Sequence, residues 1–390
     1  MSKVKAVIWN LPVLRSILRR LDTLERQVAA LAEGVNQITA AAPPVSPKEE
    51  TALDALLLTA KQWEGFAQEL ERTLPEQELL SLLWSLQSLV GKLAFAREER
   101  SRKFFYGTQK LGFSLVPVTY ESPVPRVDAI PPWVWRHRFD LTPAFRLPTA
   151  PQWELLERIA HWGEEMSTTP EEAESGYFWK NNAFGPVEAV IYHCMIREFK
   201  PRRVLEVGAG YSTLVAVKAA AMNGTTRVEA VDPYPRPFLR NCPGVFRLWE
   251  RPVQDVPLSN FERLEANDIL FVDSSHVCAT GSDVNFIVFE VLPRLKPGVL
   301  VHFHDIFLPW EYPEPWLKEL RIFYNEQYLL LAFLMFNEAY EALLATRLLT
   351  MENEERIRKL FPFLPWIKAC SFWMRRKPAA EGCGAVPGEA

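Results

Sequence analysis

The stretch Val204-Leu-Glu-Val-Gly-Ala-Gly-Tyr-Ser-Thr213 decides the fold, because a short apolar run passes through one acid into two closely spaced glycines. Gly208 and Gly210 let the backbone bend tightly and let a ligand approach it closely. Ser212 and Thr213 can begin the helix that follows, whose free N–H groups favour electron-rich ligand groups. The stretch therefore predicts a strand, a nucleotide-binding turn and a helix.

The acids around this turn indicate which nucleotide it binds. Glu206 lies two residues before Gly208, where a dinucleotide fold usually keeps an apolar residue, and position 213 is Thr instead of the third glycine of G-x-G-x-x-G. Pyrophosphate binding is therefore disfavoured, and a carboxylate here suits a cationic ligand. Asp232 ends the next apolar run, 22 positions after Gly210, as expected of an acid that receives two ribose hydroxyls. An adenosine ligand is expected.

The motif Glu206-Val-Gly208-Ala-Gly210, followed by Asp232, resembles motif I of the class I S-adenosylmethionine-dependent methyltransferases. The resemblance implies S-adenosyl-L-methionine as the cofactor. In that family the glycine turn and its acid lie around the methionine part, and the second acid binds the ribose. Ser212, at the start of the following helix, is included among the expected cofactor contacts.

One further cofactor contact follows from the same resemblance. The pair Gln254-Asp255 precedes the strand expected at 269–272, at a place where family members often contact the adenine amino group. Asp255 is therefore a candidate cofactor residue, and a turn without cofactor contact is the alternative.

The composition of the whole chain excludes several classes of protein. A net charge of −4 and a pI near 6.0 argue against a broad nucleic-acid footprint. The first residues lack the apolar core of a signal peptide, and no run approaches the 18 apolar residues of a membrane span. The cysteines have no C-x-x-C spacing and an odd count, which indicates neither a zinc knuckle nor a disulfide framework and favours a cytoplasmic protein. They stand at positions 194, 242, 278, 370 and 383.

The amino-terminal segment 1–40 has the spacing of a coiled coil. Its apolar residues alternate three- and four-residue steps from Leu14 to Ile38. We therefore expect a homo-oligomer, with a lone amphipathic helix packed on its own domain as the alternative. An Ala- and Pro-rich linker follows at 41–48, and the broad apolar face of 49–111 predicts a packed helical region.

Proline and aromatic residues are interleaved over 112–174, which predicts an ordered, extended segment. The family resemblance implies a lid over the cofactor and acceptor, and a packed connector without ligand contact is the alternative. Residues 351–377 are expected to form a C-terminal helical extension. The small, polar segment 378–390 is expected to be a disordered tail.

Apolar strands and helices alternate within 175–350, the range expected for the methyltransferase domain. Alternation of this kind predicts an α/β fold with a Rossmann-like, doubly wound, mostly parallel sheet. Ligands of such sheets bind beyond the carboxyl ends of the strands. The expected strands are 204–207, 227–231, 245–249, 269–272 and 299–303, and the expected helices are 212–222 and 283–293.

Four polar side chains follow the last two of these strands. Asp273 and His276 come after the strand at 269–272, and His304 and Asp305 follow the strand at 299–303. Methyl transfer from a sulfonium to a hydroxyl needs positioning and removal of the acceptor proton, because the leaving group is already good. A histidine near its reference pKa of about 6.5 can take that proton. We expect His276 or His304 to be this base.

A divalent ion is the other route to deprotonation, because it lowers the pKa of a bound hydroxyl. Asp273, His304 and Asp305 resemble the ligands of metal-dependent small-molecule and sugar O-methyltransferases, which hold magnesium at these strand ends. The resemblance implies Mg²⁺, although His304 stands where an acid is often found. The sequence permits either route. A structural cap at Asp273 and a buried His304–Asp305 pair are the alternatives, and His302 is expected to be a core histidine.

Two later segments can contribute to the same pocket. Pro309-Trp-Glu-Tyr-Pro-Glu-Pro-Trp316 is rich in aromatic rings and rigid prolines, so it can wall an acceptor pocket or pack beneath a loop. The segment Asn325-Glu-Gln-Tyr328 starts an apolar helical run, and its polar groups can point back to the pocket.

These patterns predict an S-adenosylmethionine-dependent methyltransferase that acts on oxygen of a small molecule or glycan. An NAD(P)-dependent oxidoreductase is the alternative enzyme, and both Glu206 and the missing third glycine count against it. A coiled-coil scaffold whose methyltransferase-like domain has lost catalysis is the non-enzymatic alternative. The residues do not name the methyl acceptor.

Overall fold

The computed structural model describes residues 119–378 together with the single positions 106, 109, 112 and 114. The chain divides into two compact units, Met1–Pro117 and Val118–Ala390. The second unit contains the described fold. The predicted coiled coil at 1–40, the linker at 41–48, the helical region at 49–111 apart from those single positions and the tail from 379 lie outside the described residues, so the homo-oligomer stays a prediction.

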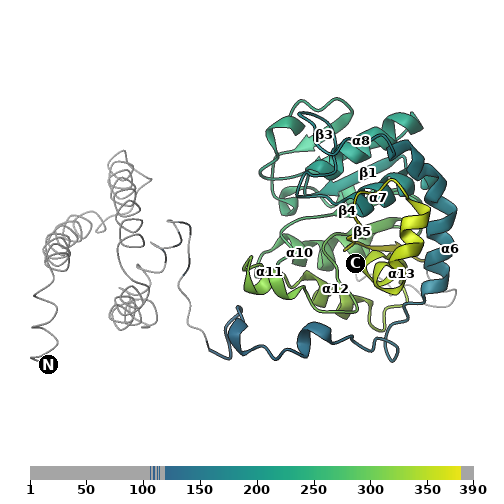
Figure 1. Ribbon diagram of the computed structural model, residues 1–390. Coiled ribbons are helices and arrows are strands. Elements are labelled where there is room, and N and C mark those ends of the chain that lie inside the picture. The colour runs from purple at the N-terminus through teal and green to yellow at the C-terminus, as the bar shows by residue number, and fades with distance from the viewer. Residues whose placement is uncertain (1–105, 107–108, 110–111, 113, 115–118, 379–390) are drawn as a thin grey trace, which may run out of the picture. The chain divides into compact units, whose positions relative to one another are not determined.

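The described unit is built on one mixed sheet of seven strands in the order β3-β2-β1-β4-β5-β7-β6 (Figure 1). The first five strands in the chain pair in parallel, and β7 runs antiparallel to both β5 and β6. The predicted Rossmann-like, mostly parallel α/β fold is thereby confirmed. The strand order reverses between β1 and β4, which is where such sheets bind ligands. The strands are β1 (Arg203–Val207), β2 (Arg227–Val231), β3 (Val245–Trp249), β4 (Ile269–Val272), β5 (Leu300–Phe303), β6 (Tyr340–Ala345) and β7 (Phe372–Arg376).

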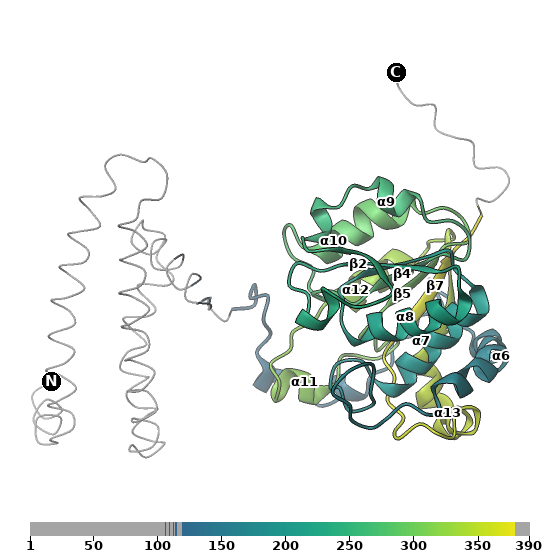
Figure 2. The same cartoon turned by 90° about the horizontal axis from the view of Figure 1, so that it is seen from above.

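Helices cover both faces of the sheet (Figure 2). Helices α6, α7, α8 and α13 lie against one face, and α9, α10 and α12 lie against the other. The helices are α6 (Thr149–Ile159), α7 (Pro186–Phe199), α8 (Tyr211–Asn223), α9 (Ser259–Glu262), α10 (Asp283–Phe286), α11 (Glu314–Lys318), α12 (Glu326–Leu334) and α13 (Thr346–Leu360).

Strand alternation divides the core into two halves. In β1, Val204 packs with the α7 and α8 side chains, whereas Leu205 and Val207 pack on the opposite face. Successive strand residues point to opposite faces, so a parallel strand buried on both sides is apolar almost throughout. Glu206 is the exception in β1, since it lies fully buried on the α7 and α8 face.

The structure differs from the sequence predictions in two places. The helix expected at 283–293 is broken into α10, a π-helical turn at Ile287–Val291 and a 3₁₀ turn at Leu292–Arg294, where Pro293 cannot donate a helical hydrogen bond. The expected helical extension at 351–377 contains the end of α13 but also β7, a strand inside the sheet. The α/β unit therefore continues past the expected boundary at 350.

The proline-rich segment packs beside the loop that follows β5. The amide of Phe139 donates to the Pro309 carbonyl at 2.8 Å, and Arg138 and Trp310 form an isolated antiparallel bridge. The amide of Phe336, after α12, donates to the Ala144 carbonyl at 2.9 Å. These contacts join the middle of the predicted lid or connector to the loop after β5 and to the end of α12.

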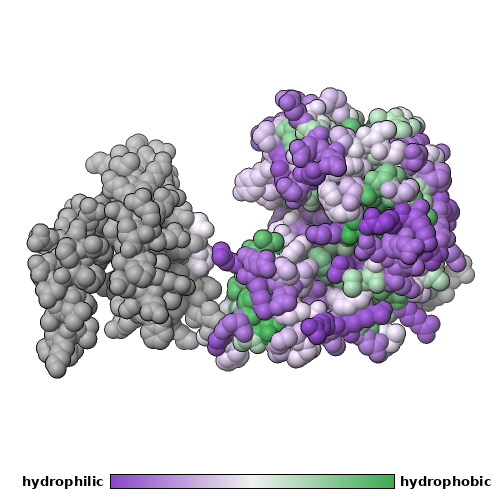
Figure 3. All heavy atoms as spheres, viewed as in Figure 1, coloured by the Kyte–Doolittle hydropathy of each residue, from purple (hydrophilic) through white to green (hydrophobic). Residues whose placement is uncertain are grey.

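The face shown in Figure 3 is mainly hydrophilic, with an apolar area near α11 at its lower left. Leu320, just after α11, is one of the large apolar side chains with more than half of its surface exposed. Within the described part of the chain, no helix is long and apolar enough to cross a membrane.

One close backbone contact ties β1 to β4. Gly208 has a φ of +86°, and a Cβ built on it would lie 1.7 Å from the carbonyl oxygen of Asp273. No side chain fits at this distance, so only glycine lets the turn after β1 pass the end of β4.

We predict that Gly208→Ala destabilises the fold by about 3 kcal/mol or more, because the methyl group must displace backbone. Gly224→Ala is the matched control, since its φ is +77° but nothing lies within 4 Å of the added Cβ; its expected cost is about 1 kcal/mol. Urea unfolding of the three proteins measures the difference. Equal losses in both variants would contradict the contact.

Candidate functional site

The first acid of the glycine turn lies beneath it. The Glu206 carboxylate accepts hydrogen bonds from the Tyr192 hydroxyl at 2.9 Å and the Thr213 hydroxyl at 2.5 Å. Burial, only partly offset by these bonds, raises its pKa to about 8. Glu206 therefore joins α7, β1 and α8, and it shapes the turn from below.

The second acid holds the turn from the side. Asp232, at the end of β2, accepts from the Ala209 amide at 3.0 Å and from the Tyr234 amide at 2.7 Å. A carboxylate has about four acceptor positions, so two stay available for ligand hydroxyls. Gly210 leaves open space, because a Cβ built there would meet only the Arg236 Nε, at 3.8 Å.

The remaining predicted cofactor residues differ in their positions. Ser212 is buried at the start of α8, where its hydroxyl contributes to the hydrogen bonding of Glu206. Asp255 is exposed in the 3₁₀ turn Val253–Asp255 after β3. Five of the six predicted residues thus surround one turn, and Asp255 lies on a separate loop. They are Glu206, Gly208, Gly210, Ser212, Asp232 and Asp255.

An imidazole connects the ends of β4 and β5. His276 Nε2 lies 3.1 Å from Asp273 Oδ1 and 3.8 Å from Asp305 Oδ2, while its Nδ1 lies 2.9 Å from Glu326 Oε2. Glu326 is the first residue of α12 and lies 50 residues after His276 in the sequence. We call Asp273, His276, Asp305 and Glu326 the strand-end cluster.

The backbone fixes the loop that carries this histidine. The His276 carbonyl accepts from the amides of Asn325 and Glu326 at 3.1 and 3.2 Å. The Ser275 amide donates to Asp283 of α10 at 2.9 Å. His276 and Asp305 both have positive φ, of 59° and 54°, a conformation that non-glycine residues rarely adopt and that is enriched at functional sites.

Neighbouring opposite charges shift the pKa values of Asp273 and His276 more than burial does. Burial opposes the charge on Asp273, but His304 and His276 outweigh it and lower the pKa of Asp273 to about 2. Burial also opposes the charge on His276, yet Asp273 and Glu326 outweigh it and raise its pKa well above the usual value. Asp273 and His276 therefore form an ion pair in the free protein.

The other two histidines have separate surroundings. His302 is stacked on Phe271 with ring centroids 4.0 Å apart, and burial lowers its pKa well below the usual value. It lies in the core, as the sequence predicted. His304 packs against Phe184 at 5.2 Å; burial lowers its pKa, but Asp273 and Asp305 outweigh this and raise it.

Sequence reasoning missed two groups beside Asp305. The Cys370 thiol donates to Asp305 Oδ1 at 3.2 Å, and the Cys370 amide donates to the buried Glu188 carboxylate at 2.6 Å. Burial, with the charges of Asp305 and Glu188, raises the pKa of this thiol well above its usual value. A polar Glu188 within the apolar α7 pattern is the one signal in the sequence that could have been followed.

The predicted magnesium set does not converge in one place. Within the described residues, Asp273, His276 and Asp305 form one group of possible metal ligands, and His304, Asp305 and Cys370 form another. In the first group His276 Nε2 already lies between the two carboxylates. Magnesium prefers oxygen ligands in octahedral geometry, so these side chains do not fit it as they are placed.

Aromatic residues border the strand-end cluster. The Tyr324 ring lies 4.5 Å from the His276 ring, and Trp316 packs edge-on against Tyr324 at 5.7 Å. Glu326 and Tyr324 show that the segment near 325–328 reaches the histidine, as the sequence suggested. The aromatic segment ending at Trp316 reaches it through Tyr324.

A separate cavity of about 600 Å³ lies beside the start of α8. Its walls include Phe178, Tyr211, Lys218 and Phe238, and it is lined by none of the strand-end cluster. The cavity therefore neighbours the glycine turn but does not reach the strand-end cluster.

Comparisons with known proteins identify the class of the domain. Residues 205–306 match a family model described as a methyltransferase domain. An uncharacterised protein of Archaeoglobus fulgidus is 37% identical over 107 residues, which make up 26% of this chain and 48% of that protein. The chain thus spans about half the length of the curated relative it matches. The part of the chain from β1 to β5 therefore matches a methyltransferase domain, in agreement with the prediction from the glycine turn.

Several solved structures resemble the chain weakly. A methyltransferase of Podospora anserina bound to S-adenosylhomocysteine is 18% identical, with a TM-score of 0.34, over 68% of this chain and all of that one. An O-methyltransferase of Streptomyces achromogenes in complex with S-adenosylmethionine is 16% identical, with a TM-score of 0.30, over 60% of this chain and 92% of that one. TM-scores of this size establish nothing further, so the assignment depends on the sequence match.

The buried Glu206 predicts a pH-dependent stability. Its pKa rises from 4.5 in the unfolded chain to about 8 in the folded one. The stability that its protonated form contributes is complete below pH 4.5 and is lost as pH rises through about 8, at about 1.4 kcal/mol per pH unit. We predict that Glu206→Gln, which stays neutral, gains thermal stability relative to the wild type across that window. Melting curves at several pH values measure this gain, and a constant difference would contradict it.

Proposed function

We propose that this protein transfers a methyl group from S-adenosylmethionine to a hydroxyl oxygen of a small molecule or glycan. The observation that carries the proposal is that the glycine turn and the strand-end cluster adjoin. Gly208 packs against the backbone carbonyl of Asp273, whose carboxylate faces His276. A donor held at the turn and an acceptor held at the cluster would meet across this contact.

The turn has the features that the cofactor requires. Gly208 and Gly210 expose backbone, and Asp232 keeps free acceptor positions for ribose hydroxyls. S-adenosylmethionine would supply an electrophilic methyl group on a sulfonium. Glu206 acts here by positioning the turn, because both of its oxygens accept hydrogen bonds from the protein.

We assign proton removal to His276. Glu326 faces Nδ1 at 2.9 Å and therefore orients the ring so that Nε2 points toward Asp273 and Asp305. A carboxylate that fixes one ring nitrogen leaves the other to exchange a proton with the reacting hydroxyl. Asp273 and Asp305, partly exposed at the strand ends, would accept hydrogen bonds from the acceptor.

The charge of the cluster favours a cationic donor. Asp273 is a carboxylate with a pKa of about 2, and Asp305 lies near the same nitrogen of His276, at 3.8 Å from Nε2. A sulfonium brought near these groups would be attracted to Asp273 and would disfavour the charge on His276. Donor binding would thereby help the imidazole to become the neutral base.

We predict that Asp232→Asn weakens S-adenosylhomocysteine binding by about 10- to 100-fold, because a charged hydrogen bond contributes about 1.5–3 kcal/mol. Isothermal titration measures the affinity. Asp140→Asn is the control, since Asp140 only accepts local hydrogen bonds from Thr142. No binding by the wild type would refute the cofactor assignment, and NADH binding in its place would favour the oxidoreductase alternative.

We predict that His276→Gln lowers methyl transfer by about 10²- to 10⁴-fold, as loss of a general base does, while S-adenosylhomocysteine affinity stays within a few-fold. Labelled methyl groups transferred to components of an extract of the source cells measure the turnover. Glu326→Gln should lower turnover less, since the ring loses its orientation only. His161→Gln, at an exposed histidine, is the control. Cofactor binding without any transfer by the wild type would favour the scaffold alternative.

A further inference from the structure

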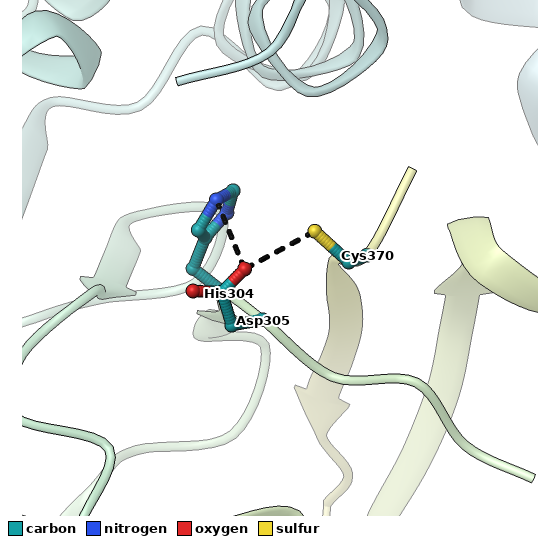
Figure 4. A group of neighbouring side chains, drawn as sticks. All are labelled: His304, Asp305 and Cys370. Carbon is teal, nitrogen blue, oxygen red and sulfur yellow. Dashed lines mark hydrogen bonds and ion pairs between the residues drawn. The ribbon is translucent and has the colours of Figure 1, made fainter. Parts of the chain in front are cut away.

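Three donors of different chemistry converge beyond the end of β5 (Figure 4). Asp305 Oδ1 lies 3.2 Å from Cys370 Sγ and 3.7 Å from His304 Nε2. The three possible ligand atoms all lie within 4.8 Å of one another. A thiol, an imidazole and a carboxylate are the three side-chain groups that bind zinc in proteins.

The backbone holds these donors together before any ligand arrives. Strands β5 and β7 are antiparallel, with Phe303 opposite Phe372, so Asp305 and Cys370 face each other two residues further on. The Ile306 amide donates to the Cys370 carbonyl, and the Cys370 amide donates to Glu188, both at 2.6 Å. Cys370 is therefore fixed on both sides.

An unpaired histidine is the second, independent observation. His304 is only 4% exposed, and among the described residues its Nδ1 has no hydrogen-bond partner. Its Nε2 is too far from Asp305 for a hydrogen bond at 3.7 Å. Buried imidazoles normally satisfy their nitrogens, but neither nitrogen of this ring is committed to a protein partner, and Nε2, which faces Asp305, can bind a cation.

The spacing of the donors agrees with tetrahedral coordination. Zinc bonds of about 2.0–2.3 Å at tetrahedral angles place neighbouring ligand atoms about 3.4–3.6 Å apart. The two measured separations, 3.2 and 3.7 Å, lie on either side of this range. Small side-chain rotations would close the site around a cation.

We propose that His304, Asp305 and Cys370 bind one thiophilic divalent cation of the zinc class. On binding, the Cys370 thiol proton that now points to Asp305 leaves to solvent, and the thiolate and the carboxylate both turn to the metal. The buried Glu188 carboxyl group accepts a hydrogen bond from the Cys370 amide and so holds this ligand from behind. Sulfur and nitrogen donors favour zinc, cobalt or iron over magnesium.

Three protein ligands leave a fourth coordination position open, as in catalytic zinc sites. The cation site itself follows from the side chains and does not depend on methyl transfer. A role for the open position, holding and polarising the acceptor oxygen, rests on the proposed function.

Cobalt(II) is the probe that tests the site. The full-length protein is first freed of metal with a chelator and then titrated with cobalt chloride. We expect one equivalent to bind, with a thiolate-to-cobalt charge-transfer band in the near ultraviolet and the intense visible bands of tetrahedral cobalt. Cys370→Ser should abolish the charge-transfer band and weaken binding at least tenfold, since even outer-shell changes cost about 10- to 100-fold. Cys242→Ser, at another partly buried thiol, should retain both.

His304→Gln provides a second variant, which should keep the thiolate but bind cobalt more weakly. Binding without a charge-transfer band, or a band that persists in Cys370→Ser, overturns the site. S-adenosylhomocysteine titration on the same samples measures cofactor binding, and binding retained in a variant shows that this variant is folded. A protein that binds cobalt through Cys370 but transfers no methyl group therefore keeps the cation site while losing the proposed function.

Discussion

The approach of Gly208 to the Asp273 carbonyl is the constraint on which the rest of the site depends. It fixes the turn after β1 against the end of β4, at the reversal of the strand order. Glu206 supports that turn from below through Tyr192 and Thr213. The proposed cofactor side and the proposed reacting side therefore meet at one backbone contact between strand ends.

Buried acids in the site divide into two electrostatic groups. Burial raises the pKa of Glu188, Glu206 and Glu326, which favours hydrogen-bonding roles behind the reacting groups. Asp273 instead has neighbouring imidazoles that keep it ionised. The end of β4 thus carries an ionised carboxylate, whereas the acids with raised pKa lie behind it on other elements. Methyl transfer from a cation can use this separation.

The strands and the acids at their ends could be predicted because short stretches of sequence determine them. The strands β1 to β5 are short apolar runs that end in polar residues, so their positions and the candidates Asp232, Asp273 and Asp305 could be read directly. Residues that only the tertiary structure brings next to these candidates could not be predicted from the sequence. Glu326 reaches His276 from α12, and Cys370 reaches Asp305 from the loop just before β7. The mixed sequence of β7, Phe-Trp-Met-Arg-Arg, lacks a clear period. The same long-range contacts explain why the predicted magnesium set was divided between two groups.

The position of β7 has a consequence for how the protein is made. It is the last strand of the sheet along the chain, yet it lies between β5 and β6. On the ribosome, β5 and β6 must therefore emerge and wait with unpaired edges until β7 inserts between them. A chain interrupted before Phe372 would leave two open strand edges, which are templates for aggregation. The few residues of β7 thus both complete the sheet beside β5 and cover these two strand edges.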